Sequence, residues 1–466
     1  MIRKISYSLY ANIFSSAVSF ISVLFIPRFF VNDIAQYGFY QIFIFYVGYI
    51  GFFHLGWCDG FYLRDGGKEY AKLPFNLYSI QFRLLVFFES IISIFIVLYA
   101  FFFVQDTNLR FIFIMISLNV VLSIPQTMIM LILQATNRIK EYSIVTITNR
   151  MIFGFLLLLI FILRLRDFKM IILSFNISYL VSLSLSVYLC NEVVFSKAAG
   201  LSNGFREAIV NISIGSKLML VNISNLLING IVRIGIQNNW SVSIFGEVSF
   251  ALSITNIVLL VVDAIAIALY PDMKQRSDDY LKKNYQTFSS IIMIPLFGAL
   301  VFYFPMIYLI KLWLPQYVNS ILYLSIIFPT FIYTAKMGLL TSTYMKVLRF
   351  EKKMLYVNLI GLVIATITTL ISTIILNNLF ILVLSILINL VIRSAIAETI
   401  VLNHLKLNYT KDIVSEFLLV VLFLVFSSQN ISLNGLLIYL CFYILFLIMS
   451  KERVINIIKF VKSRIN

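Results

Sequence analysis

Seven basic residues lie inside long stretches of apolar sequence, where a charged side chain is costly. They are Arg28, Arg83, Arg150, Lys217, Arg233, Lys336 and Arg393. An intramembrane Lys or Arg costs about 2.5 to 3.5 kcal/mol on translocon scales, so it usually faces a bundle interior or a wet cavity. A cavity that several of them share is net positive, and it favours an anionic passenger over a cationic one.

Depth within the apolar runs separates these residues into two groups. Arg28, Arg83, Arg150 and Arg233 lie within about two helical turns of the end of a run. Snorkelling of the guanidinium group to lipid headgroups is the simplest explanation for each of them alone. The matched placement of Arg28 and Arg233 in the two halves of the chain favours a functional role for that pair.

The other three basic residues lie deeper. Lys217 and Lys336 are about 10 to 12 Å from the nearer end of their runs, and Arg393 is about 14 Å from it, close to the midplane. We expect these three side chains to face a cavity and to contact the substrate. The alternative is a buried ion pair, for which Glu398 is the obvious partner of Arg393, although a spacing of five residues does not place them well on one helix face.

Two acidic residues also lie within the apolar runs, Glu89 near the middle of one and Asp263 about 10 Å from the inner end of another. Each is either a structural counter-ion or a group that takes up and releases a proton or a sodium ion. We treat both as candidate ion-coupling residues.

Motifs for catalysis or metal binding are missing from the sequence. The three cysteines are far apart, and His54 and His404 cannot form an HExxH site. Gly215, Ser216 and Lys217 resemble the end of a phosphate-binding loop, but Val210 stands where that motif requires its first glycine. The sequence therefore predicts no catalytic residues, no bound metal, no cofactor and no enzyme activity.

The composition identifies a membrane protein. Of 466 residues, 61% are hydrophobic and 12% are charged, whereas about 25% are charged in an average soluble domain. The net charge of +16 is explained by basic loops on the cytoplasmic side, so nucleic acid is not an expected partner. The first apolar run is too long for the core of a signal peptide, which predicts an uncleaved first helix.

The apolar runs predict an all-α protein with about fourteen transmembrane helices. The first six are expected at residues 8–30, 37–57, 80–104, 110–133, 144–163 and 170–190. The next six are expected at 209–235, 244–270, 286–310, 319–343, 355–376 and 379–402, followed by two shorter helices within 416–450. This pattern divides the chain into six-helix bundles at 1–195 and 209–405, a cytoplasmic linker at 196–208, and a helix pair with a basic tail at 406–466.

Basic residues also predict the orientation. Most Lys and Arg residues outside the runs fall in alternate loops, and we place these loops and both termini in the cytoplasm. The opposite loops hold Arg110, Arg164, Arg166, Lys169 and Lys311, so the segment RLRDFK is an exception to the rule. No expected outer loop is long enough for an extracytoplasmic domain.

The two halves share a sequence pattern. Arg28 precedes Tyr37-Gly38 and Asp59, and Arg233 precedes Phe245-Gly246 and Asp263. Corresponding hydrophobic units in two halves are typical of transporters built from repeats. We therefore expect two related bundles around a central cavity. Pro125 and Pro329, in the fourth and tenth helices, are candidate hinges or fixed kinks.

At these residues the chain resembles the Wzx-type polysaccharide (O-antigen unit) flippases of the multidrug/oligosaccharidyl-lipid/polysaccharide exporter superfamily. The resemblance is carried by IPRFFVNDIAQYGFYQ, HLGWCDGFYLRDGG, ILQATNRIKEYS and ALYPDMKQ, within about the first 350 residues. It implies that an undecaprenyl-diphosphate-linked glycan is moved from the inner to the outer leaflet of the bacterial inner membrane by alternating access, driven by an H⁺ or Na⁺ gradient.

The same resemblance implies that basic residues lining the lumen bind the diphosphate, a role carried to Arg28, Lys217, Arg233, Lys336 and Arg393. It also implies partnership with polymerase and chain-length proteins of lipopolysaccharide synthesis. The added C-terminal helix pair departs from the twelve-helix minimum, and in related peptidoglycan-precursor flippases such a pair helps to form a lipid groove.

Two other functions remain open at this point. An antiporter of drugs or organic cations would share the fold but should have an acidic lumen. A membrane polymerase or glycosyltransferase would generally carry a large outer loop with catalytic residues, for which this chain has no room.

Overall fold

Helices make up nearly all of the computed structural model, which describes residues 2–30, 33–274, 278–407, 410–429, 433–455 and 457. No strand occurs among these residues. The helices form two compact units, Met1–Ile223 and Ser224–Asn466. The fold is therefore all-α and built in two halves.

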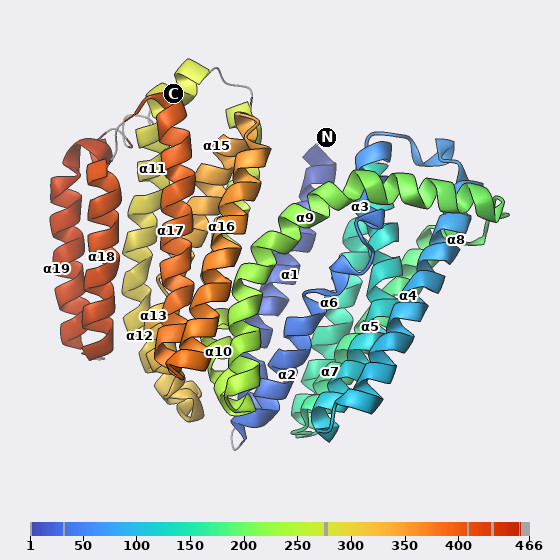
Figure 1. The fold of residues 1–466 in the computed structure, drawn as a ribbon, viewed down its shortest axis with the longest axis horizontal. Helices are drawn as coiled ribbons and strands as arrows, with labels where there is room; N and C mark the ends of the chain where they lie inside the picture. The colour runs from blue at the N-terminus through green and yellow to red at the C-terminus, as the bar shows by residue number, and fades with distance from the viewer. Residues whose placement is uncertain are drawn as a thin grey trace. The chain divides into compact units, whose positions relative to one another are not determined.

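Unit 1 contains six long or broken apolar segments followed by the first part of a long helix (blue to green in Figure 1). Its helices are α1 (Ile2–Phe29), α2 (Ile34–Val47), α3 (Trp57–Asp65), α4 (Phe75–Phe103), α5 (Thr107–Ala135), α6 (Ile139–Ile162), α7 (Phe168–Leu189), α8 (Asn191–Phe195) and the start of α9 (Leu201–Asn239). Helix α5 packs against α4 and α7, and α1 packs against α6. Asp33, Asp106 and Asp167 cap α2, α5 and α7 by accepting hydrogen bonds from backbone N–H groups.

The second expected span is broken instead of continuous. Helix α2 ends at Val47, a 3₁₀ turn follows at Ile50–Phe52, and α3 leaves at an angle of 54°. Gly56 has a φ of +84°, a conformation that glycine adopts at little cost. The His54 ring accepts a hydrogen bond from the Gly56 N–H at 3.0 Å, which fixes the turn.

Unit 2 begins within α9 and continues with α10 (Val242–Lys274), α11 (Asp278–Ala299), α12 (Tyr303–Trp313), α13 (Ser320–Ile327), α14 (Thr330–Ala335), α15 (Ser342–Val347), α16 (Glu351–Leu370), α17 (Leu379–Leu405), α18 (Thr410–Gln429) and α19 (Leu433–Met449). A short 3₁₀ turn, Leu300–Phe302, joins α11 to α12, and a second one, Pro315–Tyr317, precedes α13. Helix α16 continues as a π-helix over Ile371–Ile375.

The tenth expected span is the most irregular element of unit 2. Pro329 separates α13 from α14, and a π-helix, η5 (Lys336–Thr341), lies between α14 and α15. Proline cannot donate the backbone hydrogen bond that a continuous helix needs, and π-bulges often occur at functional sites. Lys336 is the first residue of the π-helix.

Helices α18 and α19 form an antiparallel pair at one side of unit 2 (red in Figure 1). The Tyr439 and Tyr443 hydroxyls on α19 donate to backbone carbonyls of Phe297 and Ile294 on α11, at 2.8 and 2.9 Å. Helix α18 also contacts α13. The pair is thus attached to unit 2 by polar contacts as well as by apolar packing.

The described helices make this a multi-pass membrane protein. Ten are long and apolar enough to cross a membrane, or up to twelve when each bent pair counts as one span, and α18 and α19 add two shorter apolar segments. Large apolar side chains are widely exposed on their surfaces, as expected where lipid is the solvent. A total of fourteen spans stays a prediction.

Candidate functional site

The basic residues of unit 1 lie near its surface. Arg28 is half-buried in the last turn of α1, while Arg83 and Lys217 are exposed. Arg150 on α6 donates to the Ser15 hydroxyl at 3.1 Å, and Arg83 donates to the Ser196 carbonyl at 3.3 Å. Lys217 was expected deep in a continuous span at 209–235. The structure instead begins this helix at Leu201 and bends it after Leu220, so the position of Lys217 in the sequence is no measure of its depth.

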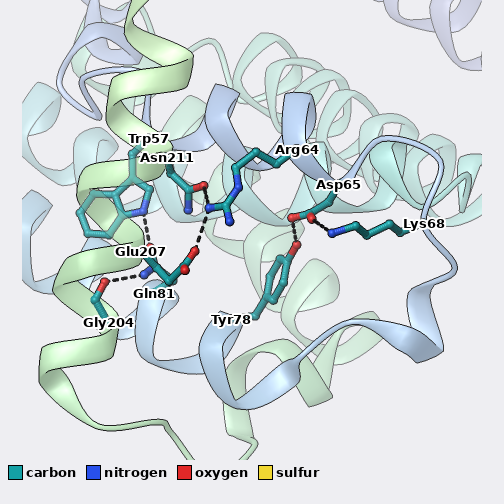
Figure 2. A network of polar contacts seen from close by, with 9 residues as sticks. All are labelled: Trp57, Arg64, Asp65, Lys68, Tyr78, Gln81, Gly204, Glu207 and Asn211. Carbon is teal, nitrogen blue, oxygen red and sulfur yellow. Dashed lines mark hydrogen bonds and ion pairs between the residues drawn. The ribbon is translucent and has the colours of Figure 1, made fainter.

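A polar network joins α3 to the first part of α9 (Figure 2). Arg64 donates to Glu207 at 2.8 Å and to Asn211 at 2.7 Å. Its neighbour Asp65 accepts from Lys68 at 2.6 Å and from the Tyr78 hydroxyl. Arg64 and Glu207 are each about one-third exposed, so this ion pair positions the helices more than it stabilises them.

Buried hydrogen bonds extend the same network into the core of unit 1. The Trp57 indole N–H donates to the Gln81 carbonyl oxygen at 2.6 Å, and the Gln81 amide donates to the Gly204 carbonyl at 2.6 Å. Figure 2 shows Gln81 of α4 lying between Trp57 of α3 and Gly204 of α9. Three helices are thus tied together through one side-chain amide.

Glycines allow α3 and α9 to touch backbone to backbone. A Cβ atom on Gly215 would lie 2.6 Å from the Gly60 nitrogen, and one on Gly60 would lie 2.7 Å from the Asn211 Cα. Small residues permit this kind of close helix crossing in membrane proteins. Gly56, Gly60 and Gly215 are therefore packing residues.

Glu89 lies at the centre of α4 and is completely buried. Neither of its carboxylate oxygens has a hydrogen-bond partner among the described residues. Burying an ionised carboxylate without a donor is very costly, so this group requires a proton or a bound cation. Its expected role in ion coupling remains a prediction, and the environment is compatible with it.

A second polar cluster lies beyond the end of α7. Arg138 stacks on the Tyr70 ring at 4.3 Å and contacts Glu141 at 3.2 Å, while the Tyr70 hydroxyl donates to Glu192 at 3.1 Å. Burial raises the pKa of the Cys190 thiol and, together with the neighbouring Cys190 and Glu192, the pKa of Tyr70. A raised pKa favours the protonated form of this thiol.

Arg393 is a buried guanidinium group with a neutral partner. It is 6% exposed on α17 and donates to the Asn225 side-chain oxygen on α9 at 2.8 Å. Gly361 on α16 makes room for it, since a Cβ atom there would lie 2.6 Å from the Arg393 Cδ. Among the described residues no carboxylate forms an ion pair with Arg393, and its Nε has no hydrogen-bond partner.

Arg233 lies near the other end of the same α9 segment. Its guanidinium donates to the Ser249 hydroxyl at 2.8 Å and stacks over the Phe245 ring at 4.9 Å. Ser249 and Phe245 are both neutral residues of α10. The matched aromatic-glycine pair noted in the sequence thus supplies a ring that holds this arginine in place.

Lys336 lies in a buried ion cluster. Its ammonium group is 2.5 Å from Glu398 Oε2 on α17 and 2.7 Å from Glu416 Oε2 on α18, and the Tyr285 hydroxyl donates to Glu398 Oε1 at 3.0 Å. All three charged side chains are at most 5% exposed. Glu398 thus pairs with Lys336 and not with Arg393. Arg393 and Glu398 are five residues apart, so their side chains project from different faces of α17.

The ion cluster changes the balance of charge that the sequence suggested. Buried acids appeared to be limited to Glu89 and Asp263, but Glu398 and Glu416 are buried too, and Glu247 is 8% exposed on α10. With both glutamates ionised, the cluster carries one excess negative charge. Glu416 was missed because it lies at the start of the last apolar run, where a charge is ordinary. Asp263 falls outside the described side chains, and the described residues contain no metal-binding group of three His, Cys, Asp or Glu.

Comparisons with known proteins identify the fold. No family model and no curated protein sequence matches this chain. Among solved structures, the lipid II flippase MurJ in an inward closed conformation superposes with a TM-score of 0.61 over 98% of this chain and 100% of that one, at 14% identity. An inward-facing multidrug resistance transporter of the MATE family superposes with a TM-score of 0.61 over 84% of this chain and 98% of that one, at 11% identity.

The chain therefore adopts the fold of multidrug/oligosaccharidyl-lipid/polysaccharide superfamily transporters. The match with the MurJ structure extends over nearly the whole chain, so it includes α18 and α19. Both structural neighbours are transport proteins, one for a lipid-linked substrate and one associated with drug resistance.

Proposed function

We propose that this protein is a Wzx-type flippase that moves an undecaprenyl-diphosphate-linked glycan from the inner to the outer leaflet of the bacterial inner membrane. The observation that carries the proposal is the buried guanidinium of Arg393, whose positive charge no described carboxylate neutralises. A buried, uncompensated positive charge is costly and is typical of a site that binds an anion. A lipid diphosphate supplies such an anion.

The remaining parts of the proposal are consistent with the fold and with the distribution of charges in the sequence. The protein alternates between an inward-open and an outward-open state. The basic loops and both termini lie in the cytoplasm. The polyprenyl tail of the substrate stays in the lipid. Arg233 in unit 2, and Arg28 and Lys217 in unit 1, bind the diphosphate at other stages of its transfer. Lys336 contacts the substrate once its ion cluster opens.

Ion coupling is assigned to buried acids. Glu89 requires a proton or cation when buried, and the excess negative charge beside Lys336 offers a second place for one. Asp263 is retained as a third candidate on sequence grounds. Uptake of H⁺ or Na⁺ from one side and release to the other would drive the exchange of states. Polymerase and chain-length proteins of the same pathway would receive the exported glycan.

Antiport of organic cations is the second candidate function. It is favoured by the buried acids Glu89, Glu398 and Glu416, which an organic cation would neutralise. The two functions make opposite demands on Arg393. A cation antiporter gains from removing a buried positive charge, whereas a flippase for an anionic lipid loses its binding site.

Replacing Arg393 with glutamine is expected to reduce surface glycan about 10- to 100-fold in a strain that depends on this protein. The estimate corresponds to the loss of hydrogen bonds to a charged group, about 1.5 to 3 kcal/mol. Arg393→Lys should retain part of the activity, because it keeps the charge but not the fork of donors.

The matched control is Arg83→Gln, which removes the same charge from an exposed position on α4. Surface glycan is measured by antibody labelling, and membrane abundance of each variant is measured alongside. Normal glycan with Arg393→Gln at normal abundance would remove Arg393 from the site, and protection against toxic cations by the wild type would favour the antiporter.

A further inference from the structure

Three guanidinium groups gather at the end of unit 1 where α1 and α6 end. Arg28 lies in the last turn of α1, and Arg164 and Arg166 follow α6 in the loop to α7. All three line one cavity of about 440 Å³, together with Phe29 and Phe161. Arg164 and Arg166 are exposed, so a ligand at the surface of unit 1 can reach their charges.

The acidic residues of the neighbouring loops are used elsewhere. Asp33 and Asp167 accept hydrogen bonds from backbone N–H groups at the starts of α2 and α7. No acidic residue is among those that line the arginine cavity. Arg110, at the same end of unit 1, donates twice to the Val104 carbonyl and takes no part in it. The residues that line the cavity therefore carry three positive charges and no negative one.

An apolar groove adjoins the arginine cavity. It lies between α1 and α6, has a volume of about 440 Å³, and shares Phe29 and Phe161 with the cavity. Apart from Ser22 and Arg150, the residues that line it are apolar or glycine, and Gly154 forms part of its wall. A positive cavity at one end of an apolar groove has the shape and polarity of a site for a lipid with an anionic head.

We propose that the arginine cavity and the α1–α6 groove form one site for a polyprenyl diphosphate lipid. The diphosphate lies against Arg28, Arg164 and Arg166, and the first isoprene units lie in the groove beside Phe29 and Phe161. Arginine forks match phosphate oxygens with paired hydrogen bonds, and burial of the chain adds apolar contact. This inference deepens the proposed function and rests on it for the identity of the lipid.

Charge decides between this lipid and an ordinary membrane phospholipid. A diphosphate diester carries two negative charges, whereas a phosphodiester headgroup carries one, and three arginines suit the larger charge. The site also accounts for the RLRDFK segment, whose basic residues depart from the usual topology pattern. These arginines lie in this loop to bind a lipid head, and they carry no information about orientation.

Binding of geranylgeranyl diphosphate to the purified full-length protein in detergent tests the site. The wild type is expected to bind this probe more tightly than either pyrophosphate, which lacks the chain, or geranylgeraniol, which lacks the charge. Dioleoyl phosphatidylglycerol, the phospholipid competitor, should displace it poorly. The double variant Arg164→Gln/Arg166→Gln should bind it at least about tenfold more weakly. Lys169→Gln, in the first turn of α7 and outside the cavity, should bind normally.

A second pair of variants tests the groove. A Cβ atom on Gly154 would lie 3.7 Å from Val18 Cγ1, which is ordinary contact, so Gly154→Ala should bind normally. Gly154→Phe fills the groove and should weaken binding of geranylgeranyl diphosphate at least about tenfold while leaving pyrophosphate binding unchanged. Thermal unfolding of each variant shows whether the fold is intact.

The outcomes separate this site from the proposed function. Equal binding by the wild type, the double arginine variant and Gly154→Phe would overturn the site, even if the protein exports glycan. Equal displacement by phosphatidylglycerol would assign the site to bulk phospholipid and overturn it as well. If the probes and variants bind in the expected order of affinity but the protein exports no glycan, the lipid site is supported and the flippase function is overturned.

Discussion

Replacing Lys336 with methionine is expected to destabilise unit 2 by about 3 to 5 kcal/mol, the largest effect of any single substitution in this region. The change leaves Glu398 and Glu416 buried side by side without a counter-ion. Removing one partner of a buried ion cluster lowers the free energy of unfolding by far more than the intact cluster adds to it, because the remaining charges stay desolvated. Thermal unfolding in detergent measures the effect as a lower Tm.

Matched variants separate the charge from the side-chain volume. Lys346→Met makes the same replacement at an exposed position on α15 and should change the unfolding free energy by less than about 0.5 kcal/mol. The triple variant Lys336→Met/Glu398→Gln/Glu416→Gln removes all three charges and should recover most of the lost stability. An unchanged Tm for Lys336→Met would show that the cluster is not buried as described.

Replacing Gly215 with alanine is expected to disrupt the crossing of α3 and α9 and to destabilise unit 1 by about 3 kcal/mol. The added Cβ would lie 2.6 Å from the Gly60 nitrogen. This neighbour belongs to the backbone, so no rotation of a side chain can relieve the overlap. Trp57 at the start of α3 bonds to Gln81, and its fluorescence should report the separation of the helices.

Gly51→Ala is the control for this substitution, because a Cβ atom on Gly51 meets nothing within 4 Å. It should leave both the Tm and the fluorescence unchanged. Full stability of Gly215→Ala would mean that α3 and α9 are not in backbone contact, and the network around Arg64 would then need another explanation.

Hydrophobicity predicted the helical architecture well because long apolar runs can only be membrane helices in a chain of this composition. The runs at 80–104, 110–133, 144–163 and 170–190 correspond closely to α4, α5, α6 and α7. The interpretation of the last apolar stretch as two short helices corresponds to α18 and α19. Breaks within runs were harder to find, since a turn such as that at Gly56 depends on tertiary contacts with α9.

The site was less predictable than the fold. A position in the sequence does not show which face of a helix a side chain lies on, so Lys217 and Arg393 looked alike although one is exposed and the other buried. Partners from distant helices were also invisible. Asn225 beside Arg393 is an ordinary polar residue in sequence, and Glu416 reaches Lys336 from a helix outside the expected twelve-helix core.

The buried positive charge of Arg393 and the buried acids Glu89, Glu398 and Glu416 have different roles in the proposed mechanism. The first binds the anionic substrate, and the others hold the coupling ion or balance Lys336. A cation antiporter would reverse this assignment, with the acids holding the substrate. Transport of a defined substrate therefore discriminates between the two functions more directly than any stability measurement.

Movement of a labelled polyprenyl-diphosphate oligosaccharide across vesicles that contain the purified protein tests the central claim. Accessibility of the glycan to an added lectin reports the leaflet in which it lies. We expect the protein to accelerate the appearance of glycan in the opposite leaflet, an imposed H⁺ or Na⁺ gradient to increase the rate, and Arg393→Gln to abolish most of it. The claim would be contradicted if the glycan changed leaflet no faster than in protein-free vesicles while the same protein preparation transported an organic cation.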